Sequence, residues 1–213
     1  MNYNTVLNAN KESSSVIAYL PGKSKEEIVL MAHADTHSNT PGANDNTATL
    51  ITLLMMAKYF SKIDHNYSLT FVASGGEEVG HLGSIHYVET RKKRQDLNKI
   101  KACINFDSLT YGPNLMIHSK DKQLSLKIEE IHNNLKLKGK PELIYENDLL
   151  DGKAFIDEGI RCVYINSRGK DQSKLKLWHR PEDIPAEVDF ELVENSFLIF
   201  TEFIKRISEE NLL

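Results

Sequence analysis

Acidic and histidine side chains recur directly after short apolar runs, and this pattern constrains the fold more than any other feature of the chain. Clusters such as VLMAHAD and INFDS close an apolar run, which predicts a strand that ends in a loop. Open α/β sheets bind ligands at the carboxyl ends of their strands. We therefore expect one site at that edge of a sheet, built from His33, Asp35, Asp45, Glu77, Glu78, Asp107 and His179.

Strand-like and helix-like segments alternate along the chain, which predicts the α/β class with helices on both faces of a mixed sheet. Apolar runs predict strands at 14–20, 28–32, 69–73, 100–106, 115–118, 143–145 and 161–165. Helical periodicity predicts helices at 47–61, 84–93, 121–137 and 190–208. The turn signal Pro21-Gly22 suggests that the first two strands form an antiparallel pair. Asp45 and Asn46 are placed to cap the helix at 47–61.

Length, charge and cysteine content constrain the domain organisation, the partners and the localisation less strongly. With no repeat or linker, residues 1–213 are expected to form one domain without an inserted lid domain. A net charge of -4 argues against a nucleic-acid or membrane partner, and the basic run at 91–94 is interpreted as a solvated helix end. Cys103 and Cys162 lie in apolar runs and are expected to be buried thiols. Because no secretory leader is visible, we expect a cytoplasmic protein, or a secreted one if a leader has been removed. No long exposed apolar stripe is readable in the sequence, so a monomer and a weak homo-oligomer both remain open.

The residue types in the expected site match the ligands that zinc prefers, which are imidazole nitrogen and carboxylate oxygen. The carboxylates of Asp45, Glu78 and Asp107 and the imidazoles of His33 and His179 can hold two ions if one carboxylate bridges them. Two divalent ions would then be balanced by three carboxylates and one hydroxide. Such two-metal sites activate a water for hydrolysis.

Two acidic residues beside these candidates suggest further roles. Glu77 precedes Glu78 in a loop, where consecutive side chains can point in different directions, so Glu77 is the candidate general base. Asp35, two residues after His33, is placed to accept the second ring N–H of that histidine and fix its tautomer.

The order and spacing of these motifs resemble those of a known family. The chain contains, in order, H-x-D, G-A-N-D-N, G-E-E-x-G-x-x-G-S, a strand ending N-F-D, and W-H-x-P-x-D. This series is similar to that of the co-catalytic di-zinc aminopeptidases of metallopeptidase family twenty-eight. The family also includes glutamate carboxypeptidases and transferrin-receptor ectodomains. The resemblance runs from about residue 14 to the C-terminus. It implies a three-layer α/β/α sandwich around a mixed, mostly parallel sheet.

The resemblance also implies a role for each candidate. Asp45 would bridge two Zn²⁺, with His33 and Asp107 on one ion and Glu78 and His179 on the other. A hydroxide bridging the ions would attack the peptide, and Glu77 would be the general base. The family often has a cis peptide after the bridging residue, here between Asp45 and Asn46. Carboxylate-rich sites also accept Co²⁺ or Mn²⁺ as substitutes.

Several positions near the candidates are expected to shape a substrate pocket. Asp151 and Phe155 resemble a segment that lies near the pocket in the family. His81 stands where the family usually has leucine, and Trp178 stands where some members have a tyrosine that stabilises the oxyanion. Arg168 is a candidate for a substrate carboxylate, although an arginine in a polar loop is more often solvated. His37 is expected to be a solvent-exposed loop histidine.

The function expected from these features is a metal-dependent aminopeptidase that acts on peptides with a free N-terminus. Three alternatives remain open. A dipeptidase or carboxypeptidase on the same fold would be favoured by Arg168. An acyltransferase of the glutaminyl cyclase type would hold a single zinc. A non-catalytic binding module would have lost its metals.

Overall fold

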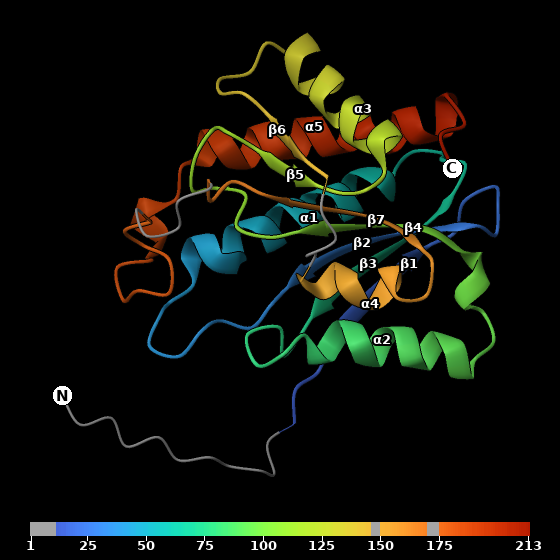
Figure 1. Cartoon of the computed structure of the whole chain (residues 1–213), viewed down its shortest axis with the longest axis horizontal. Helices are drawn as coiled ribbons and strands as arrows, with labels where there is room; N and C mark the ends of the chain where they lie inside the picture. Colours follow the sequence, from blue (N-terminus) through green and yellow to red (C-terminus); the bar gives the residue numbers. More distant parts are fainter. Residues whose placement is uncertain (1–11, 146–149, 170–174) are drawn as a thin grey trace.

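The core of the molecule is a seven-stranded sheet, seen edge-on in the middle of Figure 1. The computed structural model describes residues 12–145, 150–169 and 175–213. The strands follow the order β1-β3-β2-β4-β7-β5-β6 across the sheet. Their bounds are β1 Val16–Leu20, β2 Glu27–His33, β3 Ser68–Ser74, β4 Ile100–Phe106, β5 Met116–His118, β6 Glu142–Ile144 and β7 Arg161–Asn166.

Parallel pairing dominates the centre of the sheet. β2 is parallel to β3 on one side and to β4 on the other, and β4 is parallel to β7. The antiparallel pairs lie further out, between β1 and β3 and between β5 and β7. All seven residues of β2 are buried, as expected for a central parallel strand that is covered on both faces. The mixed, mostly parallel sheet expected from the sequence is therefore confirmed.

Helices cover both faces, so the molecule has three layers (Figure 1). Helices α1, α3 and α5 lie on one face, and α2 and α4 lie on the other. Their bounds are α1 Ala48–Phe60, α2 Leu82–Lys93, α3 Lys122–Asn134, α4 Lys153–Ile156 and α5 Phe190–Glu209. Shorter helical turns occur at Ala43–Thr47, Leu97–Lys99, Leu150–Gly152 and Pro185–Glu187. Among the described residues, none of the helices combines the length and apolarity needed to cross a bilayer.

The alternation of side chains along β2 separates two apolar cores. Ile28 and Leu30 point into the larger core, which they share with residues of α1, α3 and α5. Val29 and Met31 point into the smaller core, which they share with Tyr87 and other residues of α2 and α4. The period of two along a strand thus divides one apolar run between the two helical layers.

The predicted pairing of the first two strands is wrong. β1 pairs with β3, which lies between β1 and β2. After Pro21-Gly22 the chain crosses the start of β3, where the amides of Lys23 and Ser24 donate to the carbonyls of His65 and Asn66 at 3.1 and 2.8 Å. A side chain at Gly22 would lie 2.4 Å from the carbonyl oxygen of Tyr67, so this close crossing requires glycine. The turn signal marked a crossover rather than a hairpin.

Two further predictions about helices need correction. Asp45 and Asn46 do not cap α1, which has Thr47 at its N-cap position and no side-chain cap bond. The predicted helix at 121–137 ends earlier, at Asn134, and Asp121 is its N-cap, accepting from the amide of Leu124. Asp45 is instead turned toward the carboxyl edge of the sheet, as described below.

The basic run at 91–94 is not uniformly solvated. Arg91 is buried and its guanidinium donates to both oxygens of Glu27, at 2.8 and 2.9 Å, and to Asp96 at 2.6 Å. This pair joins the last turn of α2 to the first residue of β2. Cys103 and Cys162 are buried free thiols on neighbouring strands, as expected.

Candidate metal centre

The candidate residues meet at the carboxyl edge of the sheet. His33 is the last residue of β2, Glu77 and Glu78 follow β3, and Asp107 follows β4. Because β2, β3 and β4 are parallel, their carboxyl ends lie side by side. Asp45 reaches the same place from the turn before α1, and His179 from the segment before α5.

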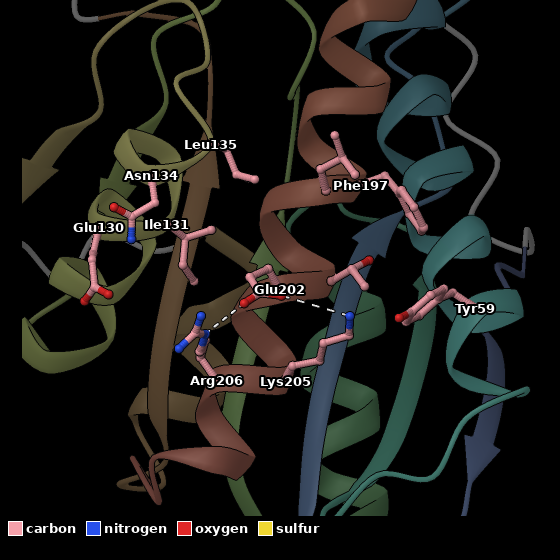
Figure 2. A pocket seen from close by; sticks show the side chains of 11 residues that line it. Tyr59, Glu130, Ile131, Asn134, Leu135, Phe197, Glu202, Lys205 and Arg206 are labelled. Atoms are coloured by element: carbon pink, nitrogen blue, oxygen red, sulfur yellow. Dashed lines mark hydrogen bonds and ion pairs between the residues drawn. The ribbon is translucent and has the colours of Figure 1, made fainter.

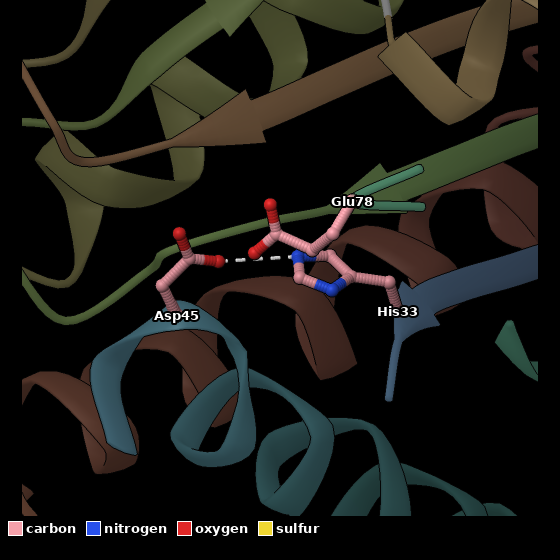
Figure 3. A group of neighbouring side chains, drawn as sticks. All are labelled: His33, Asp45 and Glu78. Atoms are coloured by element: carbon pink, nitrogen blue, oxygen red, sulfur yellow. Dashed lines mark ion pairs between the residues drawn. The ribbon is translucent and has the colours of Figure 1, made fainter. Parts of the chain in front are cut away.

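Asp45 lies at the middle of the group. Its Oδ1 is 3.1 Å from Nε2 of His33, and its Oδ2 is 3.3 Å from Nε2 of His179. Each histidine also faces a second carboxylate: His33 Nε2 is 3.5 Å from Asp107 Oδ1, and His179 Nε2 is 3.4 Å from Glu78 Oε2. Figure 3 shows Asp45, His33 and Glu78 converging from three separate elements. The arrangement has two halves that share one carboxylate.

These spacings fit divalent metal ions. With metal–ligand bonds of about 2.0–2.2 Å, two ligand atoms of a tetrahedral zinc site lie roughly 3.3–3.6 Å apart. The four distances between these candidate ligand atoms, from 3.1 to 3.5 Å, are close to that range. Among the described residues, the group with ligand atoms all within 4.8 Å of one another is His33, Asp45 and Glu78. The Oε1 atom of Glu78 is buried without a hydrogen-bond partner, which leaves a carboxylate oxygen available to a cation.

The electrostatics of the group also favour a cation. Burial opposes the charged form of His33, but hydrogen bonds and charges from Asp107 and Asp45 outweigh it and raise the pKa of His33 to about 12. Such a shift reports a strongly negative potential at Nε2. The same potential would stabilise a metal cation at that place.

Asp35 supports the group in a different way from the one expected. The Nδ1 atom of His33 faces the backbone carbonyl of Asp35 at 2.9 Å, whereas the Asp35 carboxylate is 3.8 Å away. The carboxylate instead accepts hydrogen bonds from the backbone amides of Glu77 and Glu78, each at 3.1 Å. Asp35 therefore fixes the His33 ring through its backbone and the Glu77-Glu78 loop through its side chain.

Glu77 and Asp151 both lie beside His81. The Oε1 atom of Glu77 is 3.3 Å from Nδ1 of His81, which is also 3.7 Å from Oδ1 of Asp151. Burial and, beyond it, the charges of Asp107, Asp151 and Glu78 raise the pKa of Glu77 to about 8. Asp151 is buried, and its carboxylate accepts from the Ser74 hydroxyl at 2.8 Å.

Asp107 is held by groups that the sequence did not reveal. Its Oδ2 accepts from the hydroxyl of Tyr164 at 2.8 Å and lies 3.3 Å from the guanidinium of Arg168. Its Oδ1 accepts from the hydroxyl of Ser108 at 2.7 Å. Burial alone would raise the pKa of Asp107, but the charges of Arg168 and His33 hold it well below its ordinary value. Arg168 is therefore not a solvated loop residue, because its side chain is only 9% exposed and paired.

Aromatic rings enclose His179. The imidazole of His37 is stacked on that of His179, and the Trp178 indole lies against His179 with ring centroids 4.3 Å apart. The guanidinium carbon of Arg168 lies 5.2 Å from the centre of the Trp178 ring. His37 lies in a loop, as expected, but it is half-buried and stacked on His179 rather than fully exposed to solvent. Trp178 lies against His179 on the border of the site.

Asp183 anchors the turn that carries Asp45. Its carboxylate accepts hydrogen bonds from the amide of Asn44 at 2.9 Å, from the Asn44 side chain at 2.8 Å and from the amide of Asp45 at 3.2 Å. The peptide bond between Asp45 and Asn46 is cis, as the family resemblance implied. Asp183 belongs to the W-H-x-P-x-D motif, so its place four residues after His179 was the available signal.

One expected pocket residue lies elsewhere. Phe155 is fully buried in the smaller core, where its ring lies 5.9 Å from that of Tyr87. An apolar side chain on a helix that packs against the sheet is drawn into the core, and Phe155 has no surface left to offer a substrate. Conversely, the sequence patterns did not single out Tyr111, whose hydroxyl is buried without a hydrogen-bond partner.

A separate hollow of about 340 Å³ is lined by residues of α1, α3 and α5 (Figure 2). Its charged side chains pair with one another: Arg206 lies 2.8 Å and Lys205 lies 4.0 Å from Glu202. It contains none of the candidate metal ligands. The hollow is therefore distinct from the candidate metal centre at the carboxyl edge of the sheet.

Comparison with known proteins places this geometry among peptidases. Residues 15–204 match the model of "Peptidase family M28". Aminopeptidase YwaD of Bacillus subtilis (strain 168) is 24% identical over 196 residues, which are 88% of this chain and 43% of that protein. A zinc aminopeptidase from Bacillus subtilis, BSAP, superposes with a TM-score of 0.81 at 21% identity, over 92% of this chain and 50% of that one.

A glutaminyl cyclase from an Acidobacteriales bacterium has the same fold, with a TM-score of 0.77 at 21% identity over 92% of this chain and 74% of the cyclase. The chain spans only 20% to 43% of the length of curated relatives of this kind.

Proposed function

This chain belongs to peptidase family M28, and we propose that it is a zinc-dependent aminopeptidase that removes N-terminal residues from peptides. The observation that carries the proposal is the position of Asp45, whose two oxygens face His33 and His179 separately. A carboxylate in that position can bridge two ions. In this proposal His33 and Asp107 complete one metal site, and Glu78 and His179 complete the other.

The chemistry follows from this division. Two zinc ions bound there would supply Lewis acidity, which lowers the pKa of a coordinated water and polarises the scissile carbonyl. Glu77 takes the proton from the attacking water and returns it to the leaving amine. Burial raises the pKa of Glu77 to about 8, which makes its carboxylate a stronger base than that of an exposed glutamate. The Asp35 carboxylate accepts from the backbone amides of Glu77 and Glu78, so it fixes the general base and the neighbouring metal ligand relative to each other.

The acidic surroundings also favour a substrate with a free amino group. Glu77 and Asp151 lie beside His81, and Glu78 lies beside His179, so the ionised carboxylates would attract the ammonium group of a peptide. By contrast, the guanidinium of Arg168 is already paired with Asp107 and is buried. It is therefore poorly placed to receive a substrate carboxylate, which disfavours the carboxypeptidase alternative.

A glutaminyl cyclase-type acyltransferase is the second candidate. It is favoured by the fold shared with the bacterial cyclase and would require a single metal ion. The number of ions bound and the product formed from an N-terminal glutamine distinguish the two candidates, because cyclisation releases ammonia without adding water.

The test is mass-spectrometric digestion of paired peptides, each with a free and an acetylated N-terminus, by zinc-reconstituted protein and by a chelated control. The proposal predicts stepwise loss of single residues from the free N-termini, only with zinc. Equal cleavage of acetylated peptides, or loss of ammonia from N-terminal glutamine without hydrolysis, would contradict it. Cobalt or manganese reconstitution in the same assay compares the expected substitutes.

A further inference from the structure

Three hydrogen-bond donors beside the candidate metal centre are buried and have no acceptor among the described residues. They are the hydroxyl of Tyr111, Nε1 of Trp178 and Nε of Arg168. A buried donor without an acceptor destabilises the folded state, so such groups are rare in proteins. Donors that gather at one place and stay unpaired indicate that the acceptor arrives with a ligand.

The three donors lie in one neighbourhood. The backbone amide of Tyr111 donates to the hydroxyl of Ser167 at 2.9 Å, and Ser167 directly precedes Arg168. The guanidinium carbon of Arg168 lies 5.2 Å from the centre of the Trp178 ring, and that ring lies against His179. The donors are therefore next to a candidate metal ligand and not scattered through the core.

The segment after β4 carries Tyr111 and is fixed on two sides. On one side, the Thr110 hydroxyl donates to the side chain of Asn44 at 2.6 Å, in the turn that carries Asp45. On the other side, the Ser167 hydroxyl accepts from the backbone amide of Tyr111. A donor on a fixed segment does not have to be reorganised when charge develops near it.

The Tyr111 hydroxyl keeps its proton near neutral pH. Burial and, after it, the charges of Asp45, Asp183 and Asp107 raise the pKa of Tyr111 well above its ordinary value, although the charge of Arg168 opposes them. These carboxylates belong to the candidate metal centre or to the anchor of the turn that carries Asp45. The hydroxyl is therefore a hydrogen-bond donor within the electric field of the centre.

The Tyr111 hydroxyl is also the least committed of the three donors. The Trp178 indole is packed against the Arg168 guanidinium, whose other N–H groups are directed at Asp107 and at the Tyr164 hydroxyl. The hydrogen of a tyrosine hydroxyl rotates about its C–O bond, so it can turn toward an acceptor that arrives.

The same centre has an unpaired acceptor. Oε1 of Glu78 is buried without a hydrogen-bond partner, which suits a cation. An unpaired acceptor and the unpaired Tyr111 donor thus occur at one edge of the sheet. Together they match the charges present when a carbonyl that is polarised by a cation is attacked and its oxygen becomes negative.

We propose that the Tyr111 hydroxyl donates a hydrogen bond to the carbonyl oxygen of the scissile peptide as that oxygen becomes negatively charged. This inference rests on the proposed function, since it assumes peptide hydrolysis at the candidate metal centre. It differs from the contact that the family resemblance implies, which would come from position 178.

The step is balanced as follows. Water adds to the carbonyl carbon and gives a proton to Glu77, while the π electron pair of the C=O bond moves to the oxygen. Tyr111 keeps its own proton and donates only a hydrogen bond. When the C=O bond re-forms, the C–N bond breaks and the leaving amine takes the proton from Glu77.

The test compares Tyr111→Phe with the wild-type chain, both reconstituted with zinc, whose content is counted. Steady-state kinetics on a peptide with a free N-terminus should show kcat lowered by about 10²-fold, the lower end of what one oxyanion donor contributes, with KM little changed. Binding of a phosphinic peptide, whose tetrahedral phosphorus imitates the intermediate, should weaken by a comparable factor. Tm should stay the same or rise, because the lost hydroxyl has no partner.

Tyr59→Phe is the matched control, because it makes the same chemical change in the hollow between α1, α3 and α5. It is expected to leave kcat, phosphinic peptide binding and zinc content unchanged. A Tyr111→Phe variant with wild-type kcat would overturn the inference. So would one that fails to fold, or one with lowered Tm and zinc content, since the hydroxyl would then support the fold. A wild-type chain that hydrolyses no peptide would instead overturn the proposed function itself.

Discussion

The imidazole of His37 lies flat against that of His179, with ring centroids 4.3 Å apart and planes 9° apart. Trp178 covers His179 as well, so the ring that faces Asp45 is confined by aromatic neighbours. Such contacts restrict the rotation of a side chain without using its nitrogen atoms. The position of Nε2 beside Asp45 and Glu78 is therefore supported by packing and not by ligands alone.

Removing the His37 ring tests that support. His37→Ala is expected to lower kcat/KM and metal affinity by about two- to tenfold, which corresponds to the usual contribution of an aromatic pair. His37→Phe keeps a flat ring and is expected to retain nearly wild-type values. Steady-state kinetics and zinc titration measure both effects. A His37→Phe variant as impaired as His37→Ala would show that the imidazole acts through its nitrogen atoms instead.

Asp35→Asn tests the clamp on the Glu77-Glu78 loop. One of the two carboxylate oxygens that accept backbone amides would become an NH₂ group, which cannot accept a hydrogen bond. We expect kcat to fall about 10- to 100-fold, the range for residues that orient a metal ligand or base. Asp157→Asn, at an exposed residue paired with Lys153, is the control and is expected to leave kcat unchanged. Unchanged kcat in Asp35→Asn would refute this role.

Arg91→Ala tests the buried ion pair at the opposite end of the sheet. The substitution leaves the Glu27 carboxylate buried without its guanidinium, which costs about 3–5 kcal/mol of unfolding free energy. For a chain of this size, a loss of that scale lowers Tm by roughly 10 °C. Calorimetry compares it with Arg94→Ala, an exposed neighbour on the same helix end, which is expected to shift Tm little. Equal Tm values for the two variants would contradict the account of this pair.

The sequence predicted the α/β class, most strand positions and the family because each depends on local patterns. A buried strand such as β2 shows as a continuous apolar run, and a ligand at the end of a strand shows as a polar residue directly after that run. The resemblance to the family was also confirmed, since motif order survives where overall identity is low.

What the sequence missed depends on contacts between distant segments. The pairing of β1 with β3 is decided by the crossing at Gly22 and not by the turn itself. In the sequence, Arg168 has the features of a solvated loop residue. In the structure it follows β7, and its guanidinium lies beside Asp107, which follows the neighbouring strand β4. Likewise, His37 could be placed against His179 only after the fold had joined residues that are far apart in the chain.

The most direct measurement is kcat on a peptide with a free N-terminus for Glu77→Gln, with the bound zinc counted in the same sample. We predict that kcat falls by about 10²–10⁴, the contribution of a general base, while the zinc content stays at the wild-type level. Glu78→Gln, the neighbouring control, is predicted to lose zinc as well as activity. If Glu77→Gln hydrolyses the peptide at the wild-type rate, the proposed mechanism is wrong.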